Sequence, residues 1–425
     1  MRNDDGHEPG RVDWLDLGPD PDEGVAPRDP RRRYLWYGVA AGLVVVALVL
    51  TRTQHGANRA ASSPTSPVRT PTSSSPSPTV PESSGSFVDP AAPSLTVPPD
   101  GLSTGPTVAI PRLGPPKVTS LGHPLLDVPA DWELFALGSG VLVRIQLALG
   151  RITTTPVPVV SGDVPTMLLV GSDRAFVSAL DNTTSYVVRD GKQPADLPAT
   201  LRNGASMWPG PDQQHLWTSR TDGDPTGMAL VNLDGEPTGV TIDVPELGSV
   251  QGPDGAGYLL VTGVGGLYDA RPGKVHRVTS GILRASGPTR WLAIECDDSF
   301  SCAHVVIDRA TRAHHRLSRP VDFNDLAPGT ISPDGKTAAL QSSNNISGSG
   351  IRLLDLDSGA DRPVAVTPNS TGTPWDPPWV WSPDSRWLFV TDAGGRVIII
   401  NRGTGRAAPL QTQLAQVTQL ALRHS

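Results

Sequence analysis

Three tryptophans and an aspartate near the C-terminus are the residues of this sequence best suited to binding a ligand. Residues 371–385 contain Trp375, Asp376, Trp379 and Trp381. Large rigid rings contact sugars or peptides efficiently, because little entropy is lost when they are immobilised. Trp375, Asp376 and Trp379 are therefore the candidate ligand-binding residues. The alternative for Trp379 and Trp381 is that their rings pack between neighbouring sheets.

Side chains arranged for catalysis or metal binding are not recognisable in the sequence. It contains no HExxH motif, no GxxxxGKS/T phosphate loop and no complete DxDxDG calcium loop. Asp355 and Asp357 occupy positions that are turn residues in the other repeats, which favours a structural turn. His314 and His315 are adjacent, so a strand would direct them to opposite faces. We therefore predict no catalytic residue, no bound metal and no cofactor.

The two cysteines, Cys296 and Cys302, are separated by five mostly polar residues. A hairpin with this loop brings the two sulfurs within bonding range if its strands pair in register. A disulfide is the favoured interpretation, and a pair of free thiols is the alternative. A zinc site would need further ligands, which no second cysteine pair supplies. A disulfide would imply an oxidising compartment.

The N-terminal segment has the features of a membrane anchor. Residues 1–33 are acidic and proline-bearing, end in three arginines, and are expected to be disordered. The uncharged run over residues 34–51 can span a bilayer as a helix, with two tyrosines and a tryptophan at the interface. The arginines place the N-terminus in the cytoplasm and the C-terminal region outside. A cleaved signal of twin-arginine type is the alternative.

Residues 52–117 are dominated by Ser, Thr and Pro and have few apolar side chains to bury. We expect an extended stalk, which at ~3.1 Å per residue reaches on the order of 200 Å. In the cytoplasmic tail, Trp14 lies among acidic and apolar residues, a pattern typical of short docking motifs. Trp14 is therefore a candidate contact for a cytoplasmic partner.

Beyond residue 118 the sequence repeats a strand-turn-strand unit seven times. The residue before the turn is, in successive copies, Gln146, Arg189, Asn232, Asp269, Asp308, Asp355 and Asn401. The spacings run from 37 to 47 residues, the period of a four-stranded propeller blade. Gly and Pro number 44 each, which favours turns and short strands over helices. We predict an all-β fold, a seven-bladed β-propeller over residues 118–425, with six or eight blades as the alternatives.

Tight turns and the two ends of the repeat region support a closed ring. Residues 332–335 read Ser-Pro-Asp-Gly, and residues 382–385 read Ser-Pro-Asp-Ser. Proline fixes φ at the first corner, and aspartate accepts hydrogen bonds from nearby backbone N–H groups. The first repeat lacks an innermost strand, whereas residues 416–423 form a surplus one. We expect this last strand to complete the first blade, because closure removes free sheet edges.

These Ser-Pro-Asp turns, each followed by an apolar strand, resemble those of the TolB-like and WD-repeat-like propellers of exported bacterial proteins. The resemblance covers roughly residues 125–425. It implies the propeller fold and a protein- or ligand-binding role, and it assigns no site residue. The anchor, the stalk and the ratio of 31 Arg to 4 Lys are similar to those of membrane-anchored propellers of actinobacteria.

The formal net charge of -7 argues against a nucleic-acid partner, because counterion release requires a basic face. The leading hypothesis is an extracytoplasmic binding or scaffold module that contacts a protein or glycan at the propeller mouth. One alternative is a glycosidase or lyase acting on surface polysaccharide, which would need acidic side chains converging on the central channel. A single-pass sensor is the other.

Overall fold

A computed structural model describes residues 114–159, 166–179, 185–202, 206–219, 227–245, 248–299, 301–321, 329–344, 348–369, 379–410, 414 and 416–424. The chain divides into two compact units, Met1–Val88 and Asp89–Ser425, and all described residues belong to the second. The predicted cytoplasmic tail with Trp14, the predicted transmembrane helix and nearly all of the predicted stalk lie outside the described residues. Among the residues that are described, no helix is both long and apolar enough to cross a membrane.

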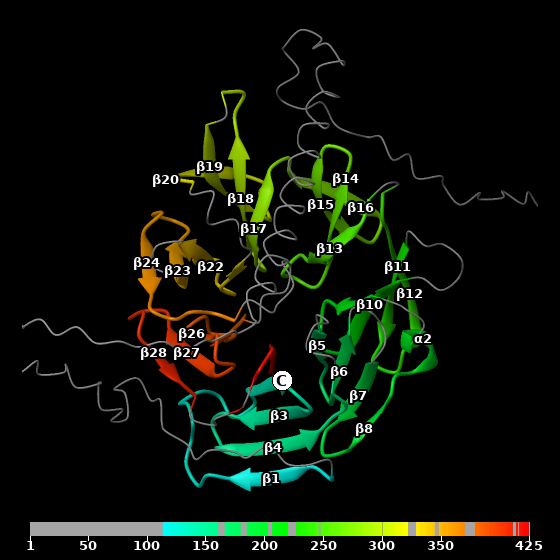
Figure 1. The fold of residues 1–425 in the computed structure, drawn as a ribbon. Coiled ribbons are helices and arrows are strands. Elements are labelled where there is room, and N and C mark those ends of the chain that lie inside the picture. Colours follow the sequence, from blue (N-terminus) through cyan, green and yellow to red (C-terminus); the bar gives the residue numbers. More distant parts are fainter. Residues whose placement is uncertain are drawn as a thin grey trace, which may run out of the picture. The chain divides into compact units, whose positions relative to one another are not determined.

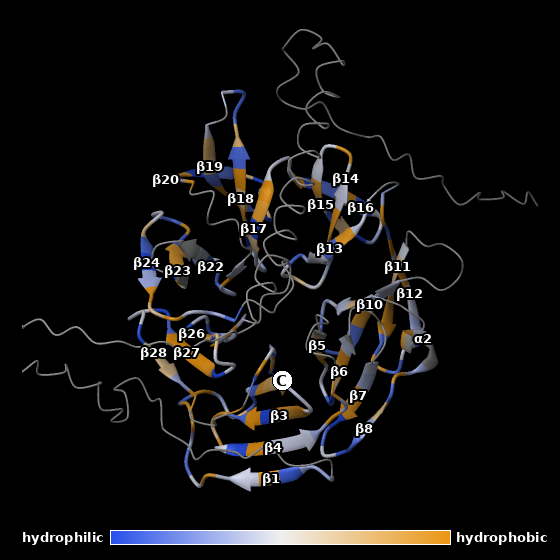
Figure 2. Ribbon diagram, viewed as in Figure 1, coloured by the Kyte–Doolittle hydropathy of each residue, from blue (hydrophilic) through white to orange (hydrophobic). Residues whose placement is uncertain are grey.

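The regular secondary structure of the described residues is almost entirely β-strand. The one helix among them is the four-residue α2 (Ala199–Arg202). The strands form mainly antiparallel sheets that are arranged around a common centre, in the manner of a propeller (Figure 1). Apolar residues concentrate on strands such as β17 (Ile282–Ser286) and β27 (Val397–Asn401), and many connecting turns are hydrophilic (Figure 2). The predicted all-β class is confirmed.

Five sheets of four or five strands are separate from one another. The first contains, in order, β29 (Gln419–Arg423), β2 (Glu133–Gly138), β3 (Val141–Gln146), β4 (Arg151–Pro156) and β1 (Lys117–Ser120). The second contains β5 (Thr166–Val170), β6 (Arg174–Ala179), β7 (Ser185–Arg189) and β8 (Pro194–Asp196). The third contains β9 (Met207–Pro209), β10 (His215–Ser219), β11 (Gly227–Asn232) and β12 (Pro237–Asp243). The fourth contains β13 (Val250–Pro253), β14 (Leu259–Gly263), β15 (Gly266–Arg271) and β16 (Lys274–Thr279), and the fifth contains β25 (Trp379–Trp381), β26 (Trp387–Thr391), β27 and β28 (Ala407–Pro409).

Eight further strands form one continuous sheet. One half contains β17, β18 (Arg290–Cys296), β19 (Cys302–Asp308) and β20 (His314–Pro320), and the other contains β21 (Gly329–Ile331), β22 (Thr337–Asn344), β23 (Gly348–Asp355) and β24 (Asp361–Val364). The halves are joined where β17 and β21 pair in parallel at Ala285–Gly329 and Ser286–Thr330. The predicted seven blades are therefore not matched by seven separate sheets. The described residues form five separate sheets and one double sheet, because this parallel pair bridges two four-stranded units.

The first sheet contains both ends of the described chain. The C-terminal strand β29 pairs antiparallel with β2, with Leu422 opposite Leu134. The predicted closure by the C-terminal strand is confirmed. On the outer edge of the same sheet, β1 pairs with β4 as a fifth strand. This strand was not predicted, because its residues are mostly exposed and carry no apolar alternation.

Local hydrogen bonds account for the Ser-Pro-Asp turns. The Asp334 carboxylate accepts hydrogen bonds from the Ser332 hydroxyl (2.7 Å) and from the backbone N–H of Lys336 (3.1 Å). The turn at residues 382–385 repeats this arrangement, with the Ser382 hydroxyl donating to Asp384 over 2.6 Å. Gly335 has a φ of +72°, a conformation that favours glycine. Each turn thus delivers the chain into the next strand in a defined direction.

The apolar core lies between neighbouring sheets rather than within one layer. Trp387 and Phe389 of β26, for example, belong to one buried cluster with Leu134 and Ile145 of the first sheet. Because alternate side chains of a strand point to opposite faces, each sheet contributes to the clusters on both of its sides. The turns at the ends of the strands are therefore free to carry polar groups.

Candidate functional site

The predicted ligand-binding residues Trp375, Asp376 and Trp379, together with the neighbouring Trp381, divide into two sets. Trp375 and Asp376 lie outside the described residues. Trp379 and Trp381 are in β25 and are 5% and 6% exposed. Both belong to an apolar cluster formed with the neighbouring β21–β24 unit. Trp379 therefore packs between neighbouring sheets, which was the alternative to ligand binding. It cannot present its ring to a ligand in this conformation.

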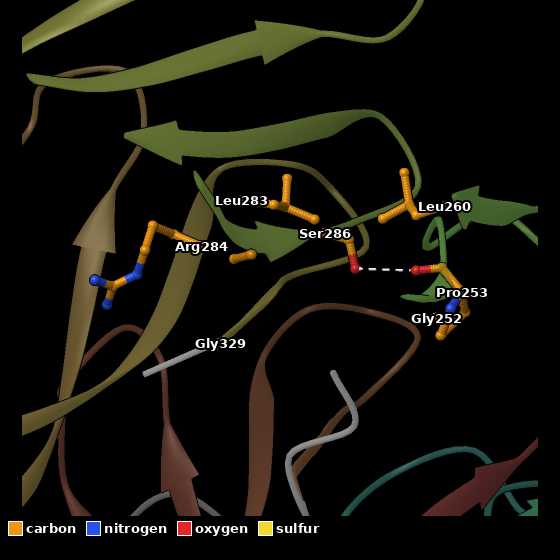
Figure 3. A pocket seen from close by; sticks show the side chains of 8 residues that line it. Gly252, Pro253, Leu260, Leu283, Arg284, Ser286 and Gly329 are labelled. Atoms are coloured by element: carbon orange, nitrogen blue, oxygen red, sulfur yellow. Dashed lines mark hydrogen bonds between the residues drawn. The ribbon is translucent and has the colours of Figure 1, made fainter. Parts of the chain in front are cut away.

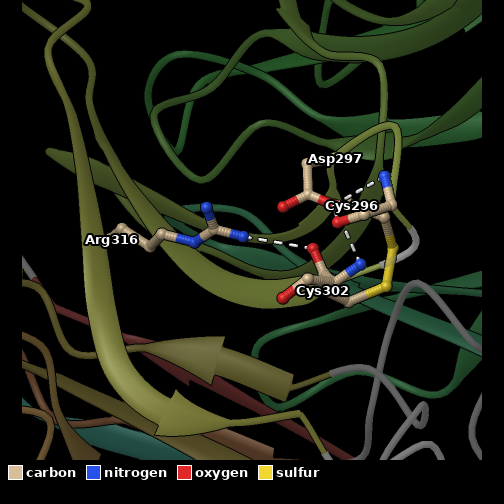
Figure 4. Close-up of a disulfide and its surroundings, with 6 residues drawn as sticks. Cys296, Asp297, Cys302 and Arg316 are labelled. Atoms are coloured by element: carbon tan, nitrogen blue, oxygen red, sulfur yellow. Dashed lines mark hydrogen bonds between the residues drawn. A yellow bond between two sulfur atoms is a disulfide. The ribbon is translucent and has the colours of Figure 1, made fainter.

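Cys296 and Cys302 form a disulfide that joins β18 to β19. The two residues are directly opposite each other in the strand register, so the bond closes the hairpin at its end. The loop beyond it is ordered by Asp297, whose carboxylate accepts the backbone N–H groups of Ser299 (3.0 Å) and Ser301 (2.9 Å). Arg316 of β20 donates to the Ser301 carbonyl over 3.2 Å (Figure 4). The disulfide is structural in this setting.

A small cavity lies where β13, β17 and β21 approach one another (Figure 3). Its walls include the fully buried Arg284, and the Ser286 hydroxyl lies 3.5 Å from the Pro253 carbonyl. The cavity measures about 10 Å³. A cavity must offer roughly this volume to hold one water molecule, so it cannot accept an organic ligand.

A much larger hollow lies between the second and third sheets, and we call it the polar hollow. It measures about 380 Å³, which is within the usual range for ligand sites, roughly 300–1,000 Å³. Its walls are the residues at the start of β6 and β10 and at the β11–β12 turn: Ser172, Asp173, Arg174, Gln214, His215, Asn232, Leu233 and Asp234. Seven of these eight residues are polar or charged, so the hollow suits a hydrophilic ligand.

Arg174 forms the floor of the polar hollow and ties the two sheets together. Its side chain is 9% exposed and donates to Asp173 over 2.7 Å and to Asp234 over 2.6 Å. The two carboxylates are 54% and 57% exposed, so they project toward solvent. The hydrogen bonds from Arg174 lower the pKa of both carboxyl groups, which are therefore ionised at neutral pH.

The other polar groups of the hollow are also held in place. The Asn232 side-chain oxygen accepts the backbone N–H groups of Asp234 (3.0 Å) and Glu236 (2.9 Å), which shapes the β11–β12 turn. His215 lies 2.8 Å from the Asp212 carboxylate, between Nδ1 and Oδ1. Groups that are fixed before a ligand arrives lose little entropy on binding.

Sequence reasoning identified parts of this site but not the site itself. It placed Asn232 immediately before a turn. It missed the polar hollow because Arg174 and Asp234 are 60 residues apart. No local sequence pattern relates two positions so far apart. The one available signal is that the two residues belong to neighbouring repeats.

Metal binding has no support within the part of the chain that the structure describes. No group of three or more His, Cys, Asp or Glu side chains is arranged there to hold a metal ion.

The fold and the polar hollow together define an all-β protein with a propeller-like arrangement of sheets and a hydrophilic hollow between two of them.

Comparisons with known proteins assign the chain to no family. No family model matches the chain, and no curated protein matches it. Among solved structures, it is similar to a protein of unknown function from Desulfotomaculum acetoxidans, with 12% identity, a TM-score of 0.42, and coverage of 69% of this chain and 99% of that one. It is also similar to an Agrobacterium tumefaciens protein assigned as a TolB, with 12% identity, a TM-score of 0.31, and coverage of 70% of this chain and 99% of that one. A prolyl endopeptidase structure has 14% identity and a TM-score of 0.46, and the match covers 73% of this chain but 50% of that one.

Proposed function

We propose that this protein is a membrane-anchored, extracytoplasmic β-propeller of seven blades that binds a hydroxyl-rich ligand, such as a glycan, without converting it. The proposal has three parts: the number of blades, the location and the binding role. Each depends on a different set of residues.

The number of blades is supported by the packing between sheets. Counting the double sheet as two four-stranded units gives seven units in chain order. Within the described residues, seven buried apolar clusters lie between successive units, including one between the last unit and the first. The parallel β17–β21 contact spans two residue pairs, whereas each half is an antiparallel sheet in itself. We therefore count β17–β20 and β21–β24 as two blades.

The location is supported by the sequence and by the disulfide. The uncharged run over residues 34–51 follows three arginines and precedes a Ser/Thr/Pro-rich segment, the order expected for an anchor, its cytoplasmic flank and a stalk. Disulfides form and persist outside the reducing cytosol. The Cys296–Cys302 bond agrees with display of the propeller on the outer side of the membrane.

The binding role is supported above all by the polar hollow. Exposed carboxylates, an asparagine, a glutamine and a histidine present acceptors and donors around about 380 Å³ of accessible space. Sugars offer many hydroxyl groups that can both donate to carboxylates and accept from amides. Arg174 holds Asp173 and Asp234 apart from each other and fixes their orientation. This set of groups suits a neutral hydroxylated ligand.

The same carboxyl groups argue against glycoside hydrolysis. A glycosidase needs one carboxylic acid with a raised pKa, so that it can protonate the leaving group. In the polar hollow the pKa of Asp173 and that of Asp234 are lowered. Asp269 does have a raised pKa because of burial, but it is fully buried beside Arg271 and Arg312. We therefore favour binding over catalysis.

The test is glycan binding by the full-length protein in detergent, on an array of bacterial surface glycans. The variant carries Asp173→Asn and Asp234→Asn together, and Asp357→Asn is the matched control. Asp357 is 56% exposed and pairs with Arg290 between two other units, so it reproduces the chemistry away from the hollow. We expect the double variant to lose about tenfold or more in affinity, since each hydrogen bond to a charged group contributes about 1.5–3 kcal/mol. Equal losses in the control, or no glycan bound by the wild type, would contradict the proposal.

A further inference from the structure

Basic side chains gather where the fourth sheet meets the neighbouring β17–β20 unit (Figure 1). Arg271 and Lys274 flank the turn between β15 and β16 and are directly opposite each other in the strand register. His276 of β16 is directly opposite Asp269 of β15. Opposite and alternate residues of a strand pair share a face, so these four side chains are neighbours. Arg312 approaches them from the turn between β19 and β20. We call Arg271, Lys274, His276 and Arg312 the basic cluster.

One buried carboxylate holds the two arginines of the basic cluster together. Asp269 Oδ2 lies 3.1 Å from Arg271 Nε and 3.2 Å from Arg312 Nη2, so both guanidinium groups converge on one atom. The Asp269 side chain is fully buried, whereas those of Arg271 and Arg312 are 35% and 33% exposed. Lys274 and His276 are exposed. The negative charge therefore lies beneath the cluster, and the positive charges face solvent.

The other charged residues close to Arg312 in the sequence do not neutralise the cluster. Arg309 forms its own buried ion pair with Asp254. Asp308 is directly opposite Arg290 of β18, and its carboxylate accepts the backbone N–H groups of its own turn. The cluster thus has three permanent positive charges against the single carboxylate of Asp269.

His276 reports the positive potential at this place. Partial burial lowers its pKa, and the charges of Arg312, Arg271 and Lys274 lower it further, with Asp269 acting in the opposite direction. The imidazole is therefore mostly neutral at pH 7. A bound anion would favour the protonated imidazole, so anion binding should be coupled to proton uptake.

A matching turn elsewhere in the ring shows what the basic cluster lacks. Residues 189–192 between β7 and β8 and residues 271–274 both read Arg-x-Gly-Lys, and each glycine has a φ of +67°. Arg189 of the first turn pairs over 3.0 Å with Asp234, which belongs to the next sheet. At the second turn the next unit supplies Arg312 in place of an acid. An external anion can take the place that Asp234 has at the first turn.

Arg312 occupies a backbone position at which the following two units have glycine. Its φ is +61°, and the equivalent Gly359 and Gly405 have φ values of +74° and +71°. This conformation is unfavourable for any residue with a Cβ atom. Its guanidinium lies 5.0 Å from the centre of the Trp291 ring, in addition to its contact with Asp269. The turn thus places a positive charge beside β16 at a cost in backbone energy.

We propose that the basic cluster binds a phosphate group, with Arg271, Lys274 and His276 donating hydrogen bonds to its oxygens. Three positive charges and one negative charge leave a balance that a dianion neutralises. Arg271 uses Nε for Asp269, which leaves its Nη atoms for the ligand. Arg312 Nη1 is enclosed, so Arg312 contributes charge rather than a further hydrogen bond. The cluster is separate from the polar hollow and does not depend on the glycan-binding proposal.

The test is calorimetric titration of the full-length protein in detergent with inorganic phosphate and with sulfate, at low ionic strength. Lys274→Gln is expected to weaken binding of both anions by about five- to tenfold, the loss of one charge-assisted hydrogen bond at a partly exposed site. Lys192→Gln is the matched control, because Lys192 is exposed and has the same place in the matching turn. It should leave the affinity unchanged.

The pH dependence tests the role of His276. Sulfate keeps its charge between pH 6 and pH 8, so any change in its affinity comes from the protein. The wild type should bind sulfate about threefold or more tightly at pH 6 than at pH 8, because the imidazole becomes protonated. His276→Gln keeps a hydrogen-bond donor but cannot titrate, and it should bind sulfate equally at both pH values.

Glucose 6-phosphate and glucose distinguish the source of the phosphate. Tighter binding of glucose 6-phosphate than of inorganic phosphate would identify a sugar ester as the ligand, and equal affinities would identify the free anion. Binding of glucose alone would be assigned to the polar hollow, and it should survive Lys274→Gln. Absence of saturable phosphate and sulfate binding to the wild type, or equal losses for Lys274→Gln and Lys192→Gln, would overturn the proposal.

Discussion

Replacement of Arg423 by methionine is expected to weaken the closure of the ring. Arg423 is in the last strand, β29, is 5% exposed, and donates to Glu133 of β2 from both Nε and Nη2. Its Nη2 atom also lies 2.7 Å from the Asp190 carboxylate, at the end of β7. One side chain thus joins the final strand to the first sheet and to the second.

The expected loss follows from what remains after the substitution. Removing one partner of a buried ion pair typically costs about 3–5 kcal/mol, because the other charge stays buried. Glu133 keeps hydrogen bonds from Arg144 and from Gln146 (2.8 Å), and Asp190 keeps its pair with Arg144 (2.8 Å). We therefore expect the lower end of the range, about 3 kcal/mol, which reduces the folding equilibrium constant on the order of a hundredfold.

The loss should depend on pH in a defined direction. Burial alone would raise the pKa of Glu133, but the hydrogen bonds from Arg144, Gln146 and Arg423 lower it by more. A carboxyl group with a lowered pKa in the folded state stabilises the fold above its ordinary pKa of about 4.5, and this contribution disappears as the pH falls through the folded value. The difference between wild type and variant should thus be full at pH 7 and shrink at acidic pH.

The assay is guanidinium unfolding of the full-length protein, followed by tryptophan fluorescence at several pH values between 3 and 7. Arg386→Met is the control, because Arg386 is 59% exposed and lies 4.0 Å from Asp384. It should change the free energy of unfolding by less than about 1 kcal/mol, as exposed ion pairs usually do. A loss for Arg423→Met no larger than that of the control, or one that is the same at pH 3 and pH 7, would refute this reasoning.

Three further substitutions test the turns, the disulfide and the core. Gly335→Val should lower the free energy of unfolding by about 2 kcal/mol in thermal unfolding, because φ is +72° and the new side chain collides with Thr289. Gly191→Val is the control: its φ is +67° and no atom lies nearby, so it has the backbone strain without the collision and should lose less stability. Joint replacement of Cys296 and Cys302 by alanine should cost about 2 kcal/mol, as estimated from closure of so short a loop, and the variant should no longer respond to a reducing agent. Trp379→Ala should cost about 3–5 kcal/mol in denaturant unfolding, since the ring is buried in the core; a change below about 1 kcal/mol would instead return Trp379 to the ligand-binding candidates.

The features that were predictable from the sequence are those made by residues close together in the chain. The third strands of most repeats end at the residues that the spacing indicated, such as Gln146 and Asn401. The Ser-Pro-Asp turns are held by hydrogen bonds between residues two to five positions apart. The disulfide is also a local contact, with a separation of 6 residues. Backbone preferences and hairpin register determine such contacts, and both can be read from residue types.

Closure of the ring was predictable for a different reason. A missing strand in the first repeat and a surplus strand at the C-terminus can be counted without any knowledge of packing. Closure relates Glu133 to Arg423 over 290 positions, yet it required only that the repeats be complete. The ion pairs that secure it were not predictable, because nothing in the repeat marks either residue.

The parallel bridge between β17 and β21, the burial of Trp379 and the polar hollow were decided by the tertiary structure. The local sequence around Trp379 fits a surface position as well as a position between two sheets. Its burial depends on which face of β25 packs against the neighbouring β21–β24 unit. The polar hollow depends on the contact between Arg174 and Asp234, which are 60 residues apart in the sequence. Sequence alone determined a repeating, closed all-β architecture with local turns and a hairpin closed by a disulfide. The places where a ligand could bind arose from contacts between sheets, because the side chains that meet there are set by register, bulges and approach distances that local residue patterns do not encode.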